Sequence, residues 1–168
     1  ESLAAFRAKP QMAGIPLLAP WADRLDEPAF YANGKRYPLG GKVARFDGAG
    51  LPIHGFLTLA SDWKVLRVEA TAREALVTSR LDFGAHPEWM AQFPFAHAIE
   101  MTYLLRDGVL EVRTRVENQG AEPMPLAIGK PPKPEVRTSP ALSLTARPGD
   151  GSIAGRKVVI LVADGVAG

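Results

Sequence analysis

The stretch AIEMTYLLRDGVLEVRTRVEN, residues 98–118, constrains the fold of this chain more than any other segment. Mostly apolar residues recur at every second position on both sides of Asp107-Gly108: Ile99, Met101, Tyr103 and Leu105, then Leu110, Val112, Thr114 and Val116. Such alternation is typical of strands with one buried face, and Asp-Gly is typical of a tight hairpin turn. The stretch therefore predicts a β-hairpin with one face in the core and the other in water.

Shorter segments extend this β pattern over most of the first 128 residues. Ranges 63–70 and 75–83 are rich in β-branched and aromatic residues, and Asn33-Gly34 marks a second hairpin within ANGKRYPL. Prolines interrupt the early part of the chain, where residues 2–8 are expected to form at most one short helical turn. Short strands between frequent turn signals predict a mainly β chain, arranged as a sandwich or a barrel.

The chain changes character after Gly129. Range 130–150 contains five prolines and little apolar periodicity, which predicts an extended linker. The continuous apolar run at 158–162 is typical of a strand covered on both faces, as in a parallel α/β sheet. The organisation that follows is a β domain over 1–129, a Pro/Gly-rich linker over 130–155 and a strand-bearing segment over 156–168.

Composition narrows the chemistry that the chain can carry. Its 168 residues include 20 basic and 18 acidic residues, interspersed, so no basic surface for nucleic acid is predicted. No apolar run reaches the length of a membrane span, and no secretory signal is recognisable. The absence of cysteine excludes disulfides, thiolate metal sites and cysteine nucleophiles. We therefore expect a cytoplasmic protein without nucleic-acid or membrane partners.

Three histidines, His54, His86 and His97, are the candidates for acid–base or metal chemistry. Their spacing contains neither an HxH nor an HxxxH pair, so we expect no metal. The glycine-rich stretches DGAG and GDGSIAG fit no dinucleotide or phosphate-binding pattern, so we expect turns there and no cofactor. The residues alone leave His54 either structural or functional, and they favour a structural role for His97 at a strand start.

Residues 14–128, within a matching region of about 1–129, resemble the aldose 1-epimerase (galactose mutarotase) family. The resemblance rests on GIPLLAPWADRL, FYANGKRYPL, LPIHGF, the tryptophan of DWKV, FPFAHAIEMTYLLRDGVLEVRTRVEN and MPLAIG, in the family's order. It implies a galactose mutarotase-like antiparallel β-sandwich, or supersandwich, whose concave face binds a hexose such as galactose or glucose. In this chain the sandwich is expected to be truncated and followed by the Pro-rich extension and one extra apolar strand.

The resemblance also implies site residues. It places His54 near the reacting oxygens of the sugar, and it matches Arg24 to a sugar-binding arginine whose fixed donors suit vicinal hydroxyls. Asp23 stands where the family often has asparagine, and Trp21 could either stack on the sugar or pack in the core. Without the resemblance, Arg24 reads as a surface arginine paired with Asp23 or Asp26.

Mutarotation opens and recloses a cyclic hemiacetal, so one group must take the anomeric hydroxyl proton while another protonates the ring oxygen. The resemblance implies that a second histidine follows Ile128-Gly129 and that a glutamate base comes later. Lys130 stands at the first position, and the strands that would carry the glutamate are not in this sequence. We therefore predict a carbohydrate-binding, isomerase-like chain with weak or lost catalysis; non-catalytic sugar binding and a purely structural fusion are the alternatives.

The residues after about 130 resemble a different family. SPALSLTARPGDGSIAGRKVVILVADGV is similar to the linker and first strand of the C-terminal domain of large-subunit catalases. This implies two unrelated fragments joined near Gly129, without a haem ligand. A sandwich that ends after MPLAIG is expected to expose a sheet edge, which the strand at 158–162 would cover in the same chain or in a second copy. Self-association through that edge is therefore predicted.

Overall fold

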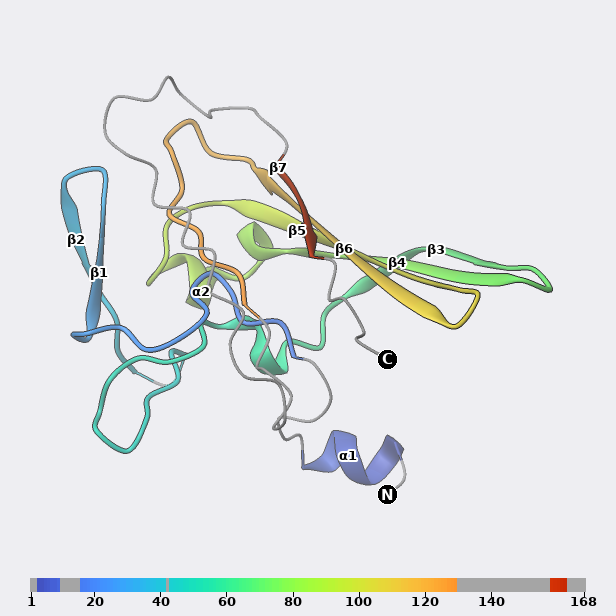
Figure 1. The fold of residues 1–168 in the computed structure, drawn as a ribbon. Coiled ribbons are helices and arrows are strands. Elements are labelled where there is room, and N and C mark those ends of the chain that lie inside the picture. Colours follow the sequence, from blue (N-terminus) through green and yellow to red (C-terminus); the bar gives the residue numbers. More distant parts are fainter. Residues whose placement is uncertain (1–2, 10–15, 42, 130–157, 163–168) are drawn as a thin grey trace. The chain divides into compact units, whose positions relative to one another are not determined.

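The computed structural model describes residues 3–9, 16–41, 43–129 and 158–162. These residues form two antiparallel sheets and a few short helices, the first of them α1 (Leu3–Ala8) (Figure 1). The described residues up to 61 and those at 125–129 belong to one compact unit, and residues 62–124 and 158–162 to another. The predicted mainly β class is confirmed. No helix in the described part of the chain is long and apolar enough to cross a membrane.

The second unit contains a five-stranded antiparallel sheet. Its strands lie side by side in chain order: β3 (Lys64–Ala70), β4 (Glu74–Asp82), β5 (His97–Arg106), β6 (Val109–Asn118) and β7 (Val158–Val162). The chain between β4 and β5 forms two short helices, η2 (Phe83–Ala85) and α2 (Pro87–Met90). Because β3 to β6 follow one another through the sheet, most of its pairing is local in sequence.

The β5–β6 hairpin forms as predicted. Asp107 and Gly108 have φ angles of 51° and 77°, and positive φ at both central residues is what the favoured two-residue hairpin turn requires. The register pairs Ile99 with Val116 and Met101 with Thr114, so the apolar positions of both strands share one face.

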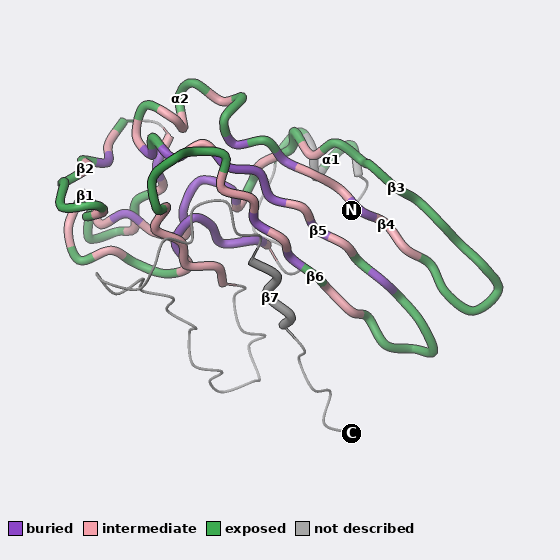
Figure 2. The backbone as a smooth tube through the Cα atoms, turned by 90° about the horizontal axis from the view of Figure 1, so that it is seen from above, coloured by how far each residue is buried: buried purple, intermediate pink, exposed green. Residues whose placement is uncertain are grey.

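Burial of that face is confirmed only at the end of the hairpin farthest from the turn (Figure 2). Ile99, Met101, Thr114 and Val116 are at most 4% exposed. Toward the turn, Tyr103, Leu105 and Leu110 are 36%, 49% and 55% exposed, so the prediction of a buried face is wrong there. The aromatic rings that form the core of this unit lie at the opposite end of β5, where Phe83, Phe93 and Phe95 pack near His97. The end near the turn therefore extends beyond this aromatic core.

The apolar run at 158–162 forms β7, which pairs antiparallel with β6 from Val116–Val158 to Val112–Val162. The predicted strand is confirmed, but the parallel α/β sheet expected around it is wrong. A short apolar run does not encode the direction of its partner, which explains the error. The strand covers the edge of β6 within the same chain. The linker predicted over 130–155 lies outside the described residues.

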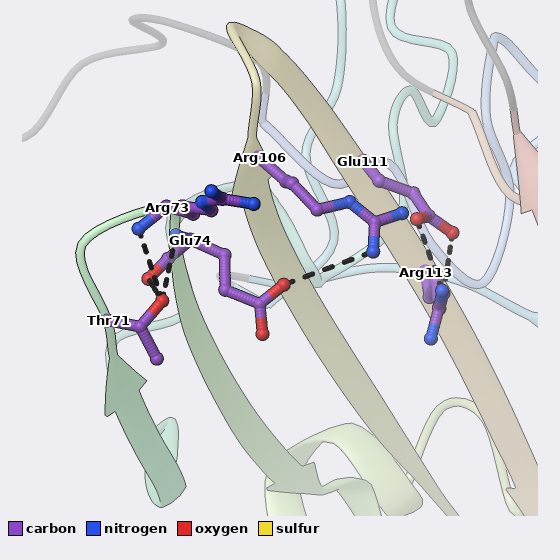
Figure 3. A network of polar contacts seen from close by, with 6 residues as sticks. All are labelled: Thr71, Arg73, Glu74, Arg106, Glu111 and Arg113. Carbon is purple, nitrogen blue, oxygen red and sulfur yellow. Dashed lines mark hydrogen bonds and ion pairs between the residues drawn. The ribbon is translucent and has the colours of Figure 1, made fainter.

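Charged residues lie near the turns of the same sheet (Figure 3). Arg113 contacts Glu111 at 2.6 and 3.1 Å, and Arg106 lies 3.9 Å from Glu74. The Thr71 hydroxyl accepts the backbone N–H groups of Arg73 and Glu74 at 3.2 and 3.1 Å. Exposed ion pairs of this kind contribute little to stability, and we assign them to the hairpin ends rather than to a site.

The first unit is largely loop. Besides α1, its regular elements are β1 (Ala29–Ala32), β2 (Lys35–Pro38) and η1 (Leu57–Leu59). Asn33 and Gly34 adopt positive φ angles of 50° and 72°, which confirms the second predicted hairpin. Isolated bridges join the remaining segments: Leu18 with Gly129, Ala19 with Gly55, Arg24 with Ile53, and Phe46 with Pro52.

Candidate functional site

The His54-Gly55 turn brings the segment around residue 54 against the segment around residue 20. Both residues are left-handed, with φ angles of 66° and 63°. A Cβ atom on Gly55 would lie 2.0 Å from the carbonyl oxygen of Ala19, so only glycine fits here. Histidine is among the few other residues that tolerate positive φ. The local geometry therefore requires glycine at position 55 and accepts histidine at position 54.

The His54 ring is fixed through one of its nitrogens. Nδ1 lies 3.1 Å from the carbonyl oxygen of Ala22. A carbonyl can only accept, so Nδ1 carries the hydrogen and Nε2 is the acceptor of the neutral ring. The backbone holds the residue on both sides, because the His54 N–H donates to the Asp23 carbonyl at 3.2 Å and the Thr58 hydroxyl donates to the His54 carbonyl at 3.1 Å. This leaves Nε2 as the nitrogen that could meet a ligand.

Arg24 is anchored by a carboxylate that the sequence alone did not single out. Its Nε donates to Oδ2 of Asp47, and neither Asp23 nor Asp26 is its partner, so the sequence-based alternative of a local pair is wrong. The Arg24 side chain is 52% exposed, whereas that of Asp47 is 11% exposed. Arg24 and Ile53 form an antiparallel bridge, and Ile53 immediately precedes His54 in the sequence. The two candidate side chains therefore come from directly paired segments.

Asp47 is held by the turn that begins at it. Its Oδ1 accepts the backbone N–H groups of Ala49 at 2.9 Å and Leu51 at 3.0 Å. The N–H of Leu51, together with that of Ala49 and the Arg24 guanidinium, keeps the pKa of the Asp47 carboxyl below its usual range. The stretch DGAG was expected to be a turn, and an aspartate opening a turn is the signal that could have identified this residue.

Trp21 and Asp23 flank the same segment. The Trp21 ring is 7% exposed and packs edge-to-face on Phe56, with centroids 5.0 Å apart. Its Nε1 is buried without a hydrogen-bond partner among the described residues. The Asp23 side chain is exposed, and its carbonyl accepts the His54 N–H. All four residues predicted for the site therefore lie in one unit, and the stacking role of Trp21 stays a prediction.

The segment 125–129 also runs along this site. Gly129 and Leu18 exchange two backbone hydrogen bonds of 2.9 and 3.0 Å, and the Ala127 N–H donates to the Pro20 carbonyl at 2.8 Å. A Cβ atom on Gly129 would lie 2.5 Å from Cβ of Ala22, whose carbonyl oxygen lies against the His54 ring. The residues that end in Ile128-Gly129 thus lie beside the anchor of His54.

The other two histidines belong to the second unit. The His86 ring stacks on Trp89 at 3.8 Å, and its Nδ1 lies 3.8 and 3.7 Å from carboxylate oxygens of Asp62 and Glu88. His97 begins β5, as predicted, and is fully buried. No group of three or more metal-ligating side chains occurs in the part of the chain that the structure describes.

Comparison with known proteins identifies the fold and the family. Residues 1–130 match the family model for aldose 1-epimerase. A galactose mutarotase-like protein from Clostridium acetobutylicum is 29% identical with a TM-score of 0.64, over 77% of this chain and 37% of that one. A protein from Synechocystis sp. PCC 6803 is 27% identical with a TM-score of 0.55, over 70% of this chain and 35% of that one.

A more distant structure supports the fold alone. It is the GalM/aldose epimerase homologue from C. elegans, 18% identical with a TM-score of 0.55, over 77% of this chain and 36% of that one. This chain therefore spans little more than a third of the length of the solved structures that it matches. Because the family model covers 130 of the 168 residues, the chain belongs to the aldose 1-epimerase family.

Proposed function

We propose that this chain binds a hexose through Arg24 and His54, and that the 168-residue polypeptide does not by itself accelerate interconversion of the α and β anomers. The observation that supports binding is that one nitrogen of each side chain is hydrogen-bonded to the protein, while its remaining nitrogens are available to a ligand. Arg24 is held through Nε, and His54 through Nδ1. Two terminal guanidinium nitrogens and one imidazole nitrogen thus remain to bind hydroxyl groups of a sugar.

Galactose is the first hexose to test, because the similar protein from Clostridium acetobutylicum is described as galactose mutarotase-like. Glucose is the natural comparison, since it differs from galactose only in the configuration at C4. Asp23 would contribute from the same segment as an exposed acceptor, and Trp21 through the predicted stacking of its ring on the sugar.

Binding is tested by NMR titration of the 15N-labelled chain with galactose. We expect Arg24→Ala to weaken binding at least about tenfold, since a hydrogen bond to a charged group contributes about 1.5–3 kcal/mol and 1.4 kcal/mol is tenfold. His54→Asn should weaken it about two- to tenfold, since a hydrogen bond between neutral groups contributes about 0.5–1.5 kcal/mol. Asparagine tolerates the left-handed backbone of residue 54, so the second variant removes the ring without disturbing the turn.

Arg36→Ala is the matched control. Arg36 lies in the same unit and pairs with Glu27 at 2.9 Å, with both side chains exposed, but it is not part of the proposed site. Its removal should leave the dissociation constant unchanged. Equal binding by the wild type, Arg24→Ala and His54→Asn would contradict the proposal, and no binding by the wild type would favour a purely structural role.

The prediction that this chain does not accelerate mutarotation rests on the two proton transfers of ring opening. Ring opening needs both an acid and a base, and loss of one partner typically costs about 10²–10⁴-fold. His54 supplies one such group, whereas Lys130 follows Ile128-Gly129 where the family resemblance implies a second histidine. We expect polarimetry of freshly dissolved α-galactose to show the spontaneous rate in the presence of the chain. A clearly faster approach to equilibrium would show that other residues complete the acid–base pair.

Self-association is a second proposal, through a different edge from the one predicted after MPLAIG: β7 pairs with β6, and β3 is the outer strand of the five-stranded sheet that is left exposed. Every residue of β3 is exposed, and β3 is an outer strand of the sheet. Val68, Val77 and Tyr103 are successive cross-strand partners, so an apolar row runs inward from that edge. We expect light scattering to show concentration-dependent dimers that Val68→Lys abolishes. A monomer at every concentration would contradict this proposal.

A further inference from the structure

From the contacts around Arg24, we infer that Asp47 is a positioning residue: it holds the Arg24 guanidinium by Nε so that the two terminal nitrogens face a pair of hexose hydroxyls. The inference rests on the proposed hexose-binding function. Asp47 itself touches no part of the proposed ligand. Its role is to fix the orientation of the residue that does.

The Asp47 carboxylate has a fixed orientation of its own. Oδ1 accepts two backbone N–H groups, those of Ala49 and Leu51, which leaves Oδ2 for Arg24. Two backbone hydrogen bonds close the turn, from the Asp47 N–H to the Leu51 carbonyl at 2.9 Å and from the Gly50 N–H to the Asp47 carbonyl at 3.0 Å. A side chain with this many partners, only 11% exposed, cannot rotate without breaking the turn.

The turn is also tied to the segments that carry the site. The Ile53 N–H donates to the Arg45 carbonyl, and the Leu25 N–H donates to the Pro52 carbonyl, both at 2.9 Å. Residues 45–54 therefore form one loop that supplies Asp47 at its start and His54 at its end. Through this loop, the anchor of Arg24 and the ring of His54 share one backbone framework.

Arg24 pairs differently from the other described arginines that bond a carboxylate through Nε; three further arginines, Arg80, Arg106 and Arg115, reach a glutamate through Nη1 alone. Arg36, Arg67 and Arg113 each contact their glutamate through both Nε and Nη2. Arg24 contacts Asp47 through Nε alone, and within the described residues Asp47 is its sole side-chain partner. A pair that served only stability would gain from the bidentate arrangement. The one-point contact instead leaves all four N–H groups of the two terminal nitrogens, and one from each nitrogen lie side by side, as a vicinal diol requires.

Asp47→Asn separates positioning from folding. The amide oxygen still accepts the N–H groups of Ala49 and Leu51, so the turn is retained, but the amide NH₂ then faces Arg24 Nε and two donors cannot bond. We expect the galactose dissociation constant to rise about three- to tenfold with a nearly unchanged unfolding midpoint. The double variant Asp47→Asn/Arg24→Ala should bind no more weakly than Arg24→Ala alone, because Asp47 acts only through Arg24.

A ligand-free readout accompanies the titration. The Nε–H of an arginine held by a hydrogen bond exchanges slowly with solvent and gives an observable 15N NMR signal. We expect the Arg24 Nε–H signal to be observed in the wild type and in Glu27→Gln. The same signal should be lost in Asp47→Asn. Glu27→Gln makes the same change at the Arg36 pair and should leave galactose binding unaltered. Wild-type binding by Asp47→Asn, or an unchanged Arg24 signal, would overturn the inference. If the wild type binds no galactose, the proposed function fails, and the Arg24 signal alone then decides whether Asp47 positions the guanidinium.

Discussion

Replacing Gly55 by alanine is expected to unfold the unit that contains Arg24 and His54. The new Cβ would lie 2.0 Å from the Ala19 carbonyl oxygen, which also accepts the N–H groups of Phe56 and Leu57. The backbone at Gly55 is left-handed, which costs a non-glycine residue about 1–2 kcal/mol. Displacing the packed segment adds about 1–3 kcal/mol, so the total loss should be about 2–5 kcal/mol.

Gly34→Ala is the matched control for Gly55→Ala. Gly34 is also left-handed, with φ of 72°, but a Cβ atom there meets nothing within 4 Å. Gly34→Ala should therefore lower the free energy of unfolding only by the conformational cost of about 1–2 kcal/mol. Urea unfolding monitored by NMR signals of Trp21 and Phe56 measures both variants. Similar free energies of unfolding for the two would show that residues 54–56 do not approach Ala19 as closely as the structure indicates.

Acidification is expected to destabilise the second unit through His97. Its ring is buried between Phe83 and Phe93, and burial lowers its pKa from 6.5 to about 4, although a hydrogen bond to the Phe95 carbonyl and the Asp82 charge oppose the shift. Nδ1 lies 2.7 Å from the Phe95 carbonyl oxygen, whereas Nε2 has no partner among the described residues. A proton on Nε2 would therefore be buried without an acceptor.

The direction of the stability change with pH follows from proton uptake at residue 97 in the unfolded chain. Between pH 6.5 and about 4 the unfolded chain binds a proton at residue 97 that the folded chain does not, so the free energy of unfolding falls as the pH falls. The stabilisation is complete above pH 6.5 and is lost by about pH 4. At 1.36 kcal/mol per pH unit, the loss amounts to about 3 kcal/mol.

Comparison with His97→Gln isolates this effect, because carboxylates that titrate in the same range are common to both proteins. The free energy of unfolding of the wild type should decrease more steeply than that of the variant between pH 6.5 and 4.5. An NMR titration of the His97 ring gives a second, variant-free readout, for which we expect a pKa near 4. Parallel stability curves, or a ring that titrates near pH 6.5, would contradict the burial of an uncharged His97.

The sequence predicted those parts of the fold that depend on neighbouring residues. Alternation about Asp107-Gly108 predicted the β5–β6 hairpin, because turn chemistry and a period of two are local properties. It did not predict that Tyr103 and Leu110 are exposed, since burial depends on what packs against a face. It also gave no information on the direction of the partner of β7, which is separated from β6 by about forty residues.

The same distinction applies to the site. Family resemblance singled out Arg24 and His54, and the His-Gly dipeptide is consistent with the left-handed turn found there. The contacts that fix the two side chains could not be predicted, because Asp47 lies 23 residues from Arg24 and Ala22 lies 32 residues from His54. The catalase-like linker and the domain boundary near Gly129 stay predictions, since residues 130–157 lie outside the described part of the chain.

Hexose binding by these paired segments is tested most directly by a crystal structure of the 168-residue chain grown with galactose. We predict sugar hydroxyls within hydrogen-bonding distance of the terminal nitrogens of Arg24 and of Nε2 of His54, with Asp47 still bonded to Arg24 Nε. Galactose held by neither side chain, or Arg24 and His54 in contact only with protein atoms at saturating sugar, would contradict the proposed function.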